Sequence, residues 1–160
     1  MRVPRLFFYC VCDIISKQED TDMFTYLRKA HYHETDQMGL IHHSNYVKWM
    51  EEARIAFMDE LGLSYRSLEE SGIASPVTGI NVEYKKPVRF DDEIEIMVSV
   101  GKYTGVKLEV KYFIYNVTSD ELSAEATSSH CFIKDGRIIS LKRDKPELDE
   151  MIRKSMEGQE

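Results

Sequence analysis

Residues 33–45 read H-E-T-D-Q-M-G-L-I-H-H-S-N and join an expected strand to an expected helix. Asp36 lies in this connection, and Gly39 supplies a backbone position that can turn freely. Ser44 or Asn45 is placed to cap the helix that follows. The start of a helix carries unsatisfied N–H groups and a partial positive charge, which stabilise an oxygen that becomes negative during a reaction. A carboxylate beside such a site indicates acyl-transfer chemistry.

The flanking residues predict the two elements that this connection joins. Residues 24–33 alternate in polarity, and the aromatic side chains among them favour a strand. After the connection, apolar residues recur at helical spacing at Tyr46, Trp49, Met50, Ala53, Phe57 and Leu61. Gly62 then stands where a left-handed helix cap is favoured. At 1.5 Å per residue the helix would be roughly 25 Å long, enough to cover one face of a small sheet.

The remainder of the chain predicts mainly strands. A short helix over residues 64–71 and a break at 72–76 come first. Apolar residues then alternate with polar ones within residues 80–84, 94–100, 106–114 and 122–133. Turn signals at 101–105, 116–121 and Asp135-Gly136 make neighbouring strands antiparallel, with 137–141 pairing back. Residues 145–154 predict a terminal surface helix with Pro146 near its first turn.

One strand, one long helix and four or five antiparallel strands predict an α+β fold with the helix against one sheet face. We assign residues 23–141 to one domain and 142–160 to a C-terminal helix and tail. Residues 1–22 are expected to be a disordered or loosely packed extension. Their apolar run is shorter than the ~20 residues of a membrane span. It also lacks the A-x-A-like cleavage site of a signal peptide, and Met23 is an alternative natural start.

Composition limits the classes of function. The 160 residues are 42% hydrophobic and 31% charged, which fits one soluble domain. The formal net charge of −7 does not favour a nucleic-acid partner. The three cysteines, Cys10, Cys12 and Cys131, are an odd number without C-x-x-C spacing, so neither a disulfide framework nor a zinc site is expected. A reducing, cytoplasmic setting is the simplest interpretation.

A fixed set of residues carries a family resemblance, namely Thr35-Asp36, Gly39, His43, Asn45-Tyr46 and Glu52-Ala53-Arg54. Their pattern, T-D-x-x-G-x-x-x-H-x-N-Y and the segment after it, resembles the 4-hydroxybenzoyl-CoA thioesterase family and its YbgC-like acyl-CoA thioesterase relatives. The resemblance covers roughly Met23 to Leu141. It implies a hot-dog fold, in which an antiparallel sheet wraps one central helix, and hydrolysis of an acyl-CoA to a carboxylic acid and CoA. It also implies a homodimer or homotetramer with active sites at the subunit interface.

The resemblance also implies roles for individual residues. Asp36 would be the catalytic carboxylate, either as the nucleophile or as the base that activates water, whereas a structural turn is the alternative from the residues alone. His43 falls at the helix start, where its backbone N–H would donate to the thioester oxygen. Its imidazole would hydrogen bond with Asp36 or the substrate, or would simply be half-buried. Gly39 and Asn45 would support the site, with Asn45 capping the helix or bonding the loop.

The substrate would meet further residues. An acyl pocket is expected near Tyr46, Met50, Ile73 and Val77. Lys85, Lys86 and Arg89 offer cations to the phosphates of CoA, although a solvated strand end is the more ordinary explanation for any single one of them. Glu51 and Glu52 are interpreted as a solvated face and an ion-pair partner for Arg54. No cofactor is expected, because CoA is part of the substrate.

The sequence also bears on a metal site, on binding without hydrolysis and on dehydratase chemistry. His31, His33, His42 and His43 suggest a metal site, but alternation along a strand would spread them over different faces, so no metal is assigned. A module that binds acyl-CoA without hydrolysing it, as a sensor does, is the principal alternative function. A hot-dog dehydratase is disfavoured because the His-Phe-Pro-Gly type of signature is absent.

Overall fold

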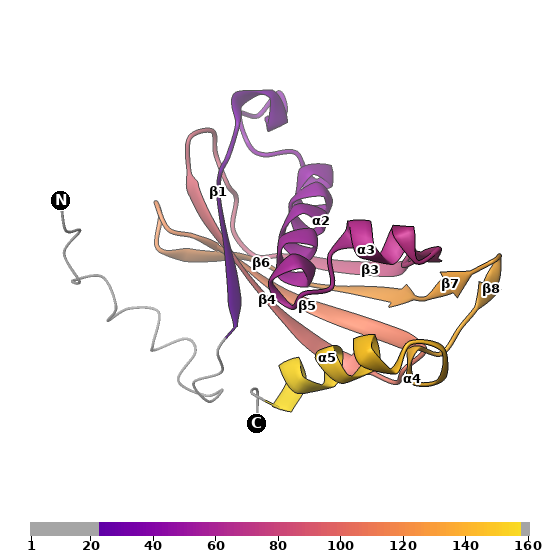
Figure 1. Cartoon of the computed structure of the whole chain (residues 1–160). Coiled ribbons are helices and arrows are strands. Elements are labelled where there is room, and N and C mark those ends of the chain that lie inside the picture. Colours follow the sequence, from indigo (N-terminus) through magenta and orange to yellow (C-terminus); the bar gives the residue numbers. More distant parts are fainter. Residues whose placement is uncertain (1–22, 158–160) are drawn as a thin grey trace.

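The main structural element is a five-stranded antiparallel sheet with strand order β1-β4-β5-β6-β3 (Figure 1). The computed structural model describes residues 23–157, so the expectation about residues 1–22 lies outside the described residues. The strands are β1 (Phe24–Lys29), β3 (Val77–Tyr84), β4 (Glu93–Tyr103), β5 (Lys107–Asn116) and β6 (Glu121–Cys131). The expected alternation is present: Ile96 of β4 pairs with Ile114 of β5, and all the apolar residues on this face of β4 are buried.

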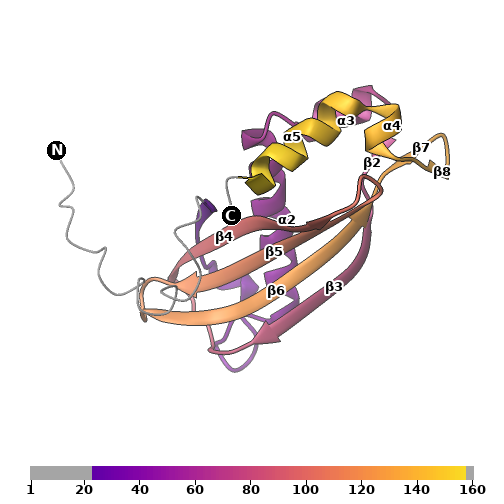
Figure 2. The same ribbon diagram turned by 90° about the horizontal axis from the view of Figure 1, so that it is seen from below.

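The long helix α2 (His43–Glu60) packs against the inner face of the sheet, which curves past it (Figure 2). Its buried face includes Trp49, Met50, Ala53 and Phe57. The ring of Phe57 meets that of Phe24 on β1 at a centroid distance of 5.8 Å. Gly62 has φ 76° directly after the helix, which confirms the expected glycine cap. Burial of each large side chain contributes about 1.5–3 kcal/mol, so this face fixes α2 on the sheet.

The first strand is shorter than expected. It ends at Lys29, and the chain then forms the short 3₁₀ helix η1 (Tyr32–Glu34). The prediction of a strand through His33 is therefore wrong. The physical reason is the Glu34 side chain, which accepts a 2.8 Å hydrogen bond from the backbone N–H of His31 and so bends the chain into a turn.

Smaller elements complete the domain: α3 (Tyr65–Glu70), β2 (Ile73–Ala74), β7 (Ile133–Lys134), β8 (Arg137–Ile138), α4 (Leu141–Asp144) and α5 (Pro146–Glu157). β2, β7 and β8 form a separate small sheet. The strand expected at 137–141 is only the two-residue β8, because Ser140 already begins α4 as its N-cap. The terminal helix is present, and its Ile152 is 1% exposed within the main core. α5 is thus packed against the body of the domain.

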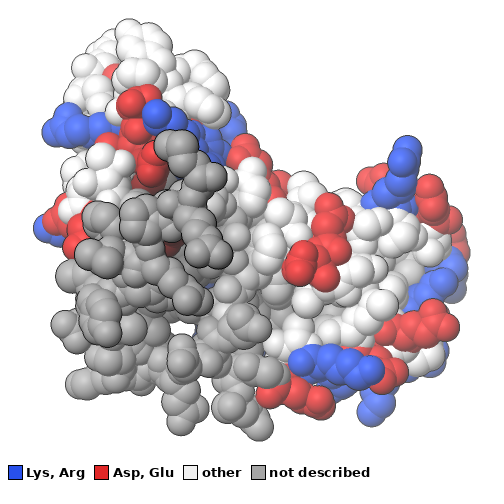
Figure 3. Space-filling model, turned by 60° about the vertical axis from the view of Figure 1, so that its left-hand side comes forward, with Lys and Arg blue, Asp and Glu red and all other residues white. Residues whose placement is uncertain are grey.

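Charged side chains of both signs are interspersed on the face drawn in Figure 3. Among residues 23–157, no helix combines the length and the apolar character that crossing a membrane requires.

Candidate active site

Asp36 is held in a tight loop between η1 and α2. Its Oδ1 accepts hydrogen bonds from the backbone N–H groups of Met38, at 2.7 Å, and Leu40, at 3.4 Å. The backbone of Asp36 also pairs with Leu40, and Gly39 has φ 71°, a conformation that favours glycine. Among the hydrogen bonds of residues 23–157, none uses Oδ2 of Asp36. One oxygen therefore fixes the turn, as the structural alternative predicted, and the other remains available.

The ends of this loop meet at the start of α2. The backbone N–H of His42 donates to the carbonyl oxygen of Glu34 at 2.9 Å, and Thr35 forms a bridge with Ile41. Asp36 is two residues after one end of the closed loop, and His43, the first residue of α2, directly follows the other. The half-buried Asp36 carboxylate therefore belongs to a loop whose two ends are tied together at the start of α2.

Glu34 anchors the loop from inside the protein. It is 6% exposed, and its Oε1 accepts hydrogen bonds of 2.7 Å from both Arg28 and Trp49. Burial alone would raise the pKa of this carboxyl, but the hydrogen bonds from His31 and Trp49, together with the charge of Arg28, lower it instead. Glu34 is therefore a buried carboxylate that connects β1, the loop and α2.

Asn45 bonds the loop and does not cap the helix. Its Nδ2 donates a 2.8 Å hydrogen bond to the carbonyl oxygen of Glu34, the second of the two roles that the sequence left open. The N-cap of α2 is His42, whose Nδ1 accepts from the backbone N–H of Ser44 at 3.3 Å. The prediction that Ser44 or Asn45 caps the helix is wrong, because both already lie within its first turn.

His43 contributes an exposed side chain and a free backbone donor. Its ring lies against that of His42, with 4.1 Å between centroids. Within residues 23–157, no hydrogen bond joins its imidazole to Asp36, and none uses its backbone N–H. Its carbonyl oxygen accepts from the hydroxyl of Tyr84 at 3.0 Å, which ties the helix start to β3. The backbone N–H is thus available to a ligand, whereas the role of the imidazole stays a prediction.

The cations expected to meet CoA differ in their surroundings. Lys85 is 2.6 Å from Glu83, and Lys86 is 3.3 Å from Glu121, so both ammonium groups already have carboxylate partners. Arg89 is exposed, and within residues 23–157 its guanidinium has no ion pair. Its backbone forms a bridge with Leu40 of the Asp36 loop. Of the three, Arg89 is therefore both the nearest in the fold to this loop and the most available to a phosphate.

A cavity of about 370 Å³ lies between α2, β3 and β6. Its lining includes Met50 and Val77, as expected for the acyl pocket, whereas Tyr46 and Ile73 are not in its wall and are buried in the core. Burial raises the pKa of Tyr46 to about 12, so its phenol stays protonated. Three polar residues also line the cavity, where Ser128 Oγ is 2.8 Å from Tyr112 Oη and 2.7 Å from His130 Nε2.

Glu51 and Glu52 on α2 form ion pairs. Glu51 lies 2.7 Å from Arg54, which confirms the expected pair, and Glu52 lies 2.7 Å from Arg28. Arg54 is 2% exposed and also donates to the hydroxyl of Tyr65 at 2.7 Å. Glu51 and Glu52 also line the cavity, but each shares its charge with an arginine.

The family comparison agrees with this geometry. A family model described as the thioesterase-like superfamily matches residues 30–156, which includes the Asp36 loop, α2 and all of the large sheet except β1. The chain belongs to the thioesterase-like superfamily. Membership confirms the α+β hot-dog fold and the thioester-hydrolase class that the sequence predicted.

Individual relatives in this superfamily are similar over most of their length. The chain is 43% identical over 102 residues to YneP of Bacillus subtilis (strain 168), named as a candidate acyl-CoA thioesterase, covering 64% of this chain and 73% of that protein. It is 29% identical over 104 residues to the acyl-CoA thioester hydrolase YbgC of Shigella flexneri, covering 65% of this chain and 78% of that protein. The solved structure of a DHNA-CoA thioesterase from Staphylococcus aureus matches with a TM-score of 0.79 and 36% identity. The match covers 83% of this chain and 90% of that one.

Sequence reasoning found the thioesterase-like loop but missed its anchors. Arg28 was interpreted as part of a strand, Glu34 as part of the connection that follows it, and Trp49 as core alone. The guanidinium carbon of Arg28 lies 4.4 Å from the ring centroid of Trp49, and both groups converge on the Glu34 carboxylate. The signal was a glutamate directly before Thr35-Asp36, but its partners become visible only in three dimensions.

Proposed function

We propose that this chain hydrolyses an acyl-CoA thioester to a free carboxylic acid and CoA, with Asp36 as the catalytic carboxylate. The observation that carries the proposal is the closed loop between Glu34 and His42: within residues 23–157 it leaves both Oδ2 of Asp36 and the backbone N–H of His43, at the start of α2, without a hydrogen bond. The carboxylate would attack the thioester carbonyl or activate water, and the N–H at the helix start would stabilise the oxyanion. Relatives named as acyl-CoA thioesterases support the substrate class.

The other parts of the site follow from the same geometry. Gly39 and Asn45 would keep the loop closed, and Met50 would line the acyl pocket within the cavity on α2. Arg89 would meet a phosphate of CoA, with Lys85 and Lys86 further along the same segment. CoA enters as part of the substrate, and the proposed reaction needs no separate cofactor. The expected cytoplasmic location stays a prediction.

We further propose that the functional unit is a homodimer, or a pair of homodimers, with sites at the subunit interface. β3 is an edge strand on which seven of eight residues are exposed, and it forms one wall of the cavity. An exposed edge strand readily pairs with another chain. A second copy pairing along β3 would cover the open side of the cavity.

The direct test measures thiol release from a panel of short-chain, long-chain and aromatic acyl-CoAs. Asp36→Asn is the informative variant, because its amide oxygen can still accept from Met38 while the negative charge is lost. We expect release to fall by about 10²–10⁴-fold with little loss of stability. Asp59→Asn, an exposed change at the other end of α2, should leave release unchanged.

Two outcomes would contradict the proposal. Unchanged release by Asp36→Asn would leave Asp36 only its structural role in the turn. Tight acyl-CoA binding by the native chain without thiol release from any substrate would identify the binding module that the sequence left open.

A further inference from the structure

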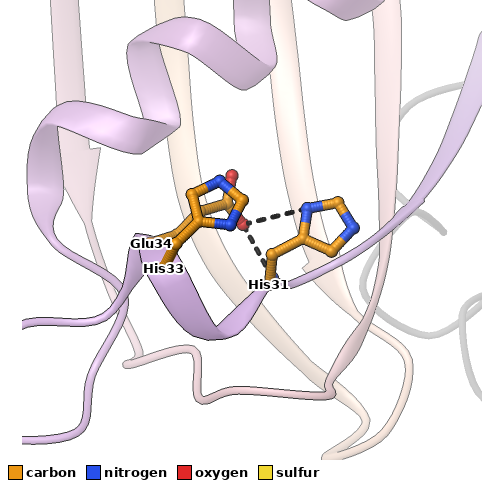
Figure 4. Close-up of side chains that lie close together, drawn as sticks. All are labelled: His31, His33 and Glu34. Carbon is orange, nitrogen blue, oxygen red and sulfur yellow. Dashed lines mark hydrogen bonds and ion pairs between the residues drawn. The ribbon is translucent and has the colours of Figure 1, made fainter.

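Two histidine rings and a buried carboxylate meet beside the Asp36 loop. The side chains of His31, His33 and Glu34 lie close together, with the Glu34 carboxylate linked to His31 (Figure 4). Their rings are exposed, with centroids 5.4 Å apart and planes inclined by only 18°. One potential ligand atom from each of the three residues lies within 4.8 Å of the other two. The arrangement exists because β1 ends at Lys29 and η1 turns the chain back, so that the Glu34 carboxylate accepts the backbone N–H of His31.

We propose that His31, His33 and Glu34 form a binding site for a divalent transition-metal ion such as Zn²⁺ or Ni²⁺. Two imidazoles and one carboxylate are a common ligand set for such ions, with bonds of about 2.0–2.2 Å. The Nδ1 atom of His31 is 3.9 Å from Oε2 of Glu34, somewhat longer than the roughly 3.4 Å between two ligands on one tetrahedral ion. Because both rings are exposed, small rotations suffice to bring their nitrogen atoms onto a shared ion.

Glu34 is already oriented for this role. Its Oε1 is fixed by Arg28 and Trp49, each at 2.7 Å. Its Oε2 accepts the backbone N–H of His31, the only hydrogen bond to this atom from within residues 23–157, and retains a second lone pair. Donors behind a ligating carboxylate fix its orientation in metal sites, which is the position that Arg28 and Trp49 occupy.

The local charge also accommodates a cation. Arg28 is 2.7 Å from both Glu34 and Glu52, so one positive charge is shared by two carboxylates. The group is left with one excess negative charge, which offsets the repulsion that Arg28 alone would exert on a metal ion. Ions that prefer oxygen ligands, such as Mg²⁺, should not bind, because imidazole nitrogens select the later transition metals.

A bound ion would connect the residue before η1 to two residues inside it. Glu34 also accepts the hydrogen bond from Asn45 that ties the Asp36 loop to α2, so the ion would stiffen the entry to that loop. Any effect on hydrolysis rests on the proposed function, but binding itself does not. The test therefore measures binding directly, and its failure is distinguishable from a failure to hydrolyse acyl-CoA.

The chain contains a single tryptophan, Trp49, whose Nε1 donates to the Glu34 carboxylate. A paramagnetic Ni²⁺ ion on that carboxylate should quench the Trp49 fluorescence. Tag-free protein in a Cys10→Ser/Cys12→Ser background excludes a polyhistidine tag and these two thiols as ligands. Titration with NiCl₂ should give saturable quenching, and calorimetry with ZnCl₂ should give one ion per chain. MgCl₂ at the same concentrations should give neither.

The variants His31→Asn and His33→Asn should each weaken binding by about tenfold or more. The matched control is His42→Asn/His43→Asn, which removes the other adjacent pair of exposed histidines. This control should keep both the quenching and the stoichiometry. Circular dichroism checks that each variant is folded, as expected for exposed side chains. Absence of saturable binding, binding that survives both His31→Asn and His33→Asn, or loss only in the control would overturn the proposal.

Discussion

The side-chain amide of Asn45 donates a 2.8 Å hydrogen bond to the backbone carbonyl oxygen of Glu34, across 11 residues of sequence. Replacement by alanine removes this link between α2 and the Asp36 loop. We expect Asn45→Ala to lower the free energy of unfolding by about 1 kcal/mol, which denaturant titration would measure. If the loop positions Asp36, kcat for thioester hydrolysis should fall more than KM changes.

Lys48→Ala provides the control for this prediction. Lys48 donates at 3.2 Å to the amide oxygen of Asn45, so its removal leaves the bond to Glu34 in place. We expect hydrolysis and stability close to those of the native chain. A fall in kcat as large as that of Asn45→Ala would mean that the bond to Glu34 is not what matters.

The buried His130 should make the folding stability of the protein fall as the pH is lowered. Burial, together with the charge of Arg54, lowers its pKa to about 4, whereas an unfolded histidine titrates near ~6.5. Between these values the unfolded chain binds more protons, so stability is lost as the pH falls from ~6.5 towards 4. The loss for this group should approach ~1.4 kcal/mol per pH unit.

His130→Gln should remove this part of the slope, measured by denaturant unfolding at several values of pH. Carboxylates such as Glu34, whose pKa is also lowered, contribute a slope of the same sign at lower pH. The difference between the native chain and the variant therefore isolates His130. The exposed control His43→Gln should keep the native slope, and an identical slope in His130→Gln would argue against a neutral buried imidazole.

The sheet could be predicted from the sequence because its information is local. Ile94, Ile96, Val98 and Val100 occupy every second position of one strand, and all of them are buried on one face of β4. The same holds for the apolar face of α2, where spacing alone identifies Trp49 and Phe57 as core. The spacing of apolar residues within a single strand or helix determines which of its sides is buried, and this spacing can be read directly from the sequence.

The site depended on contacts that no local pattern encodes. The alternation at Tyr26 and Arg28 continues through Tyr32, so nothing local indicates that the strand ends at Lys29. Its end is determined by Glu34, which is satisfied by a backbone N–H nearby and by Trp49, 15 residues away. The helix cap was misassigned for a similar reason. Serine and asparagine are common caps, but the fixed loop length places His42 at that position instead.

β3 offers a test of the proposed dimer. Ile80 is 44% exposed at this edge of the sheet and lines the cavity. In a dimer paired along β3, Ile80→Glu would place a charge in an apolar interface, so we expect a shift towards monomer in sedimentation velocity. Leu27→Glu is the matched control, because Leu27 is 67% exposed on β1, the other edge strand. Loss of association only with Leu27→Glu would place the interface on the wrong edge.

The packing of the C-terminal helix α5 against the sheet should depend on one buried carboxylate. Asp149 of α5 is 7% exposed and accepts hydrogen bonds from Tyr103 of β4 at 2.8 Å and from Arg153 at 2.7 Å. The hydrogen bond from Arg153 is the largest cause that lowers the pKa of Asp149. The contribution of Asp149 to folding stability is therefore present above ~pH 4 and is lost as the pH falls through the lowered pKa.

We expect Asp149→Ala to lower the free energy of unfolding by about 1–3 kcal/mol at neutral pH and to speed limited proteolysis of α5. Glu150→Gln, which breaks the exposed ion pair with Lys154, should destabilise the protein much less, because solvent screens that pair. Equal effects of the two changes would mean that apolar contacts such as that of Ile152 hold α5 and that the Tyr103 hydrogen bond adds nothing.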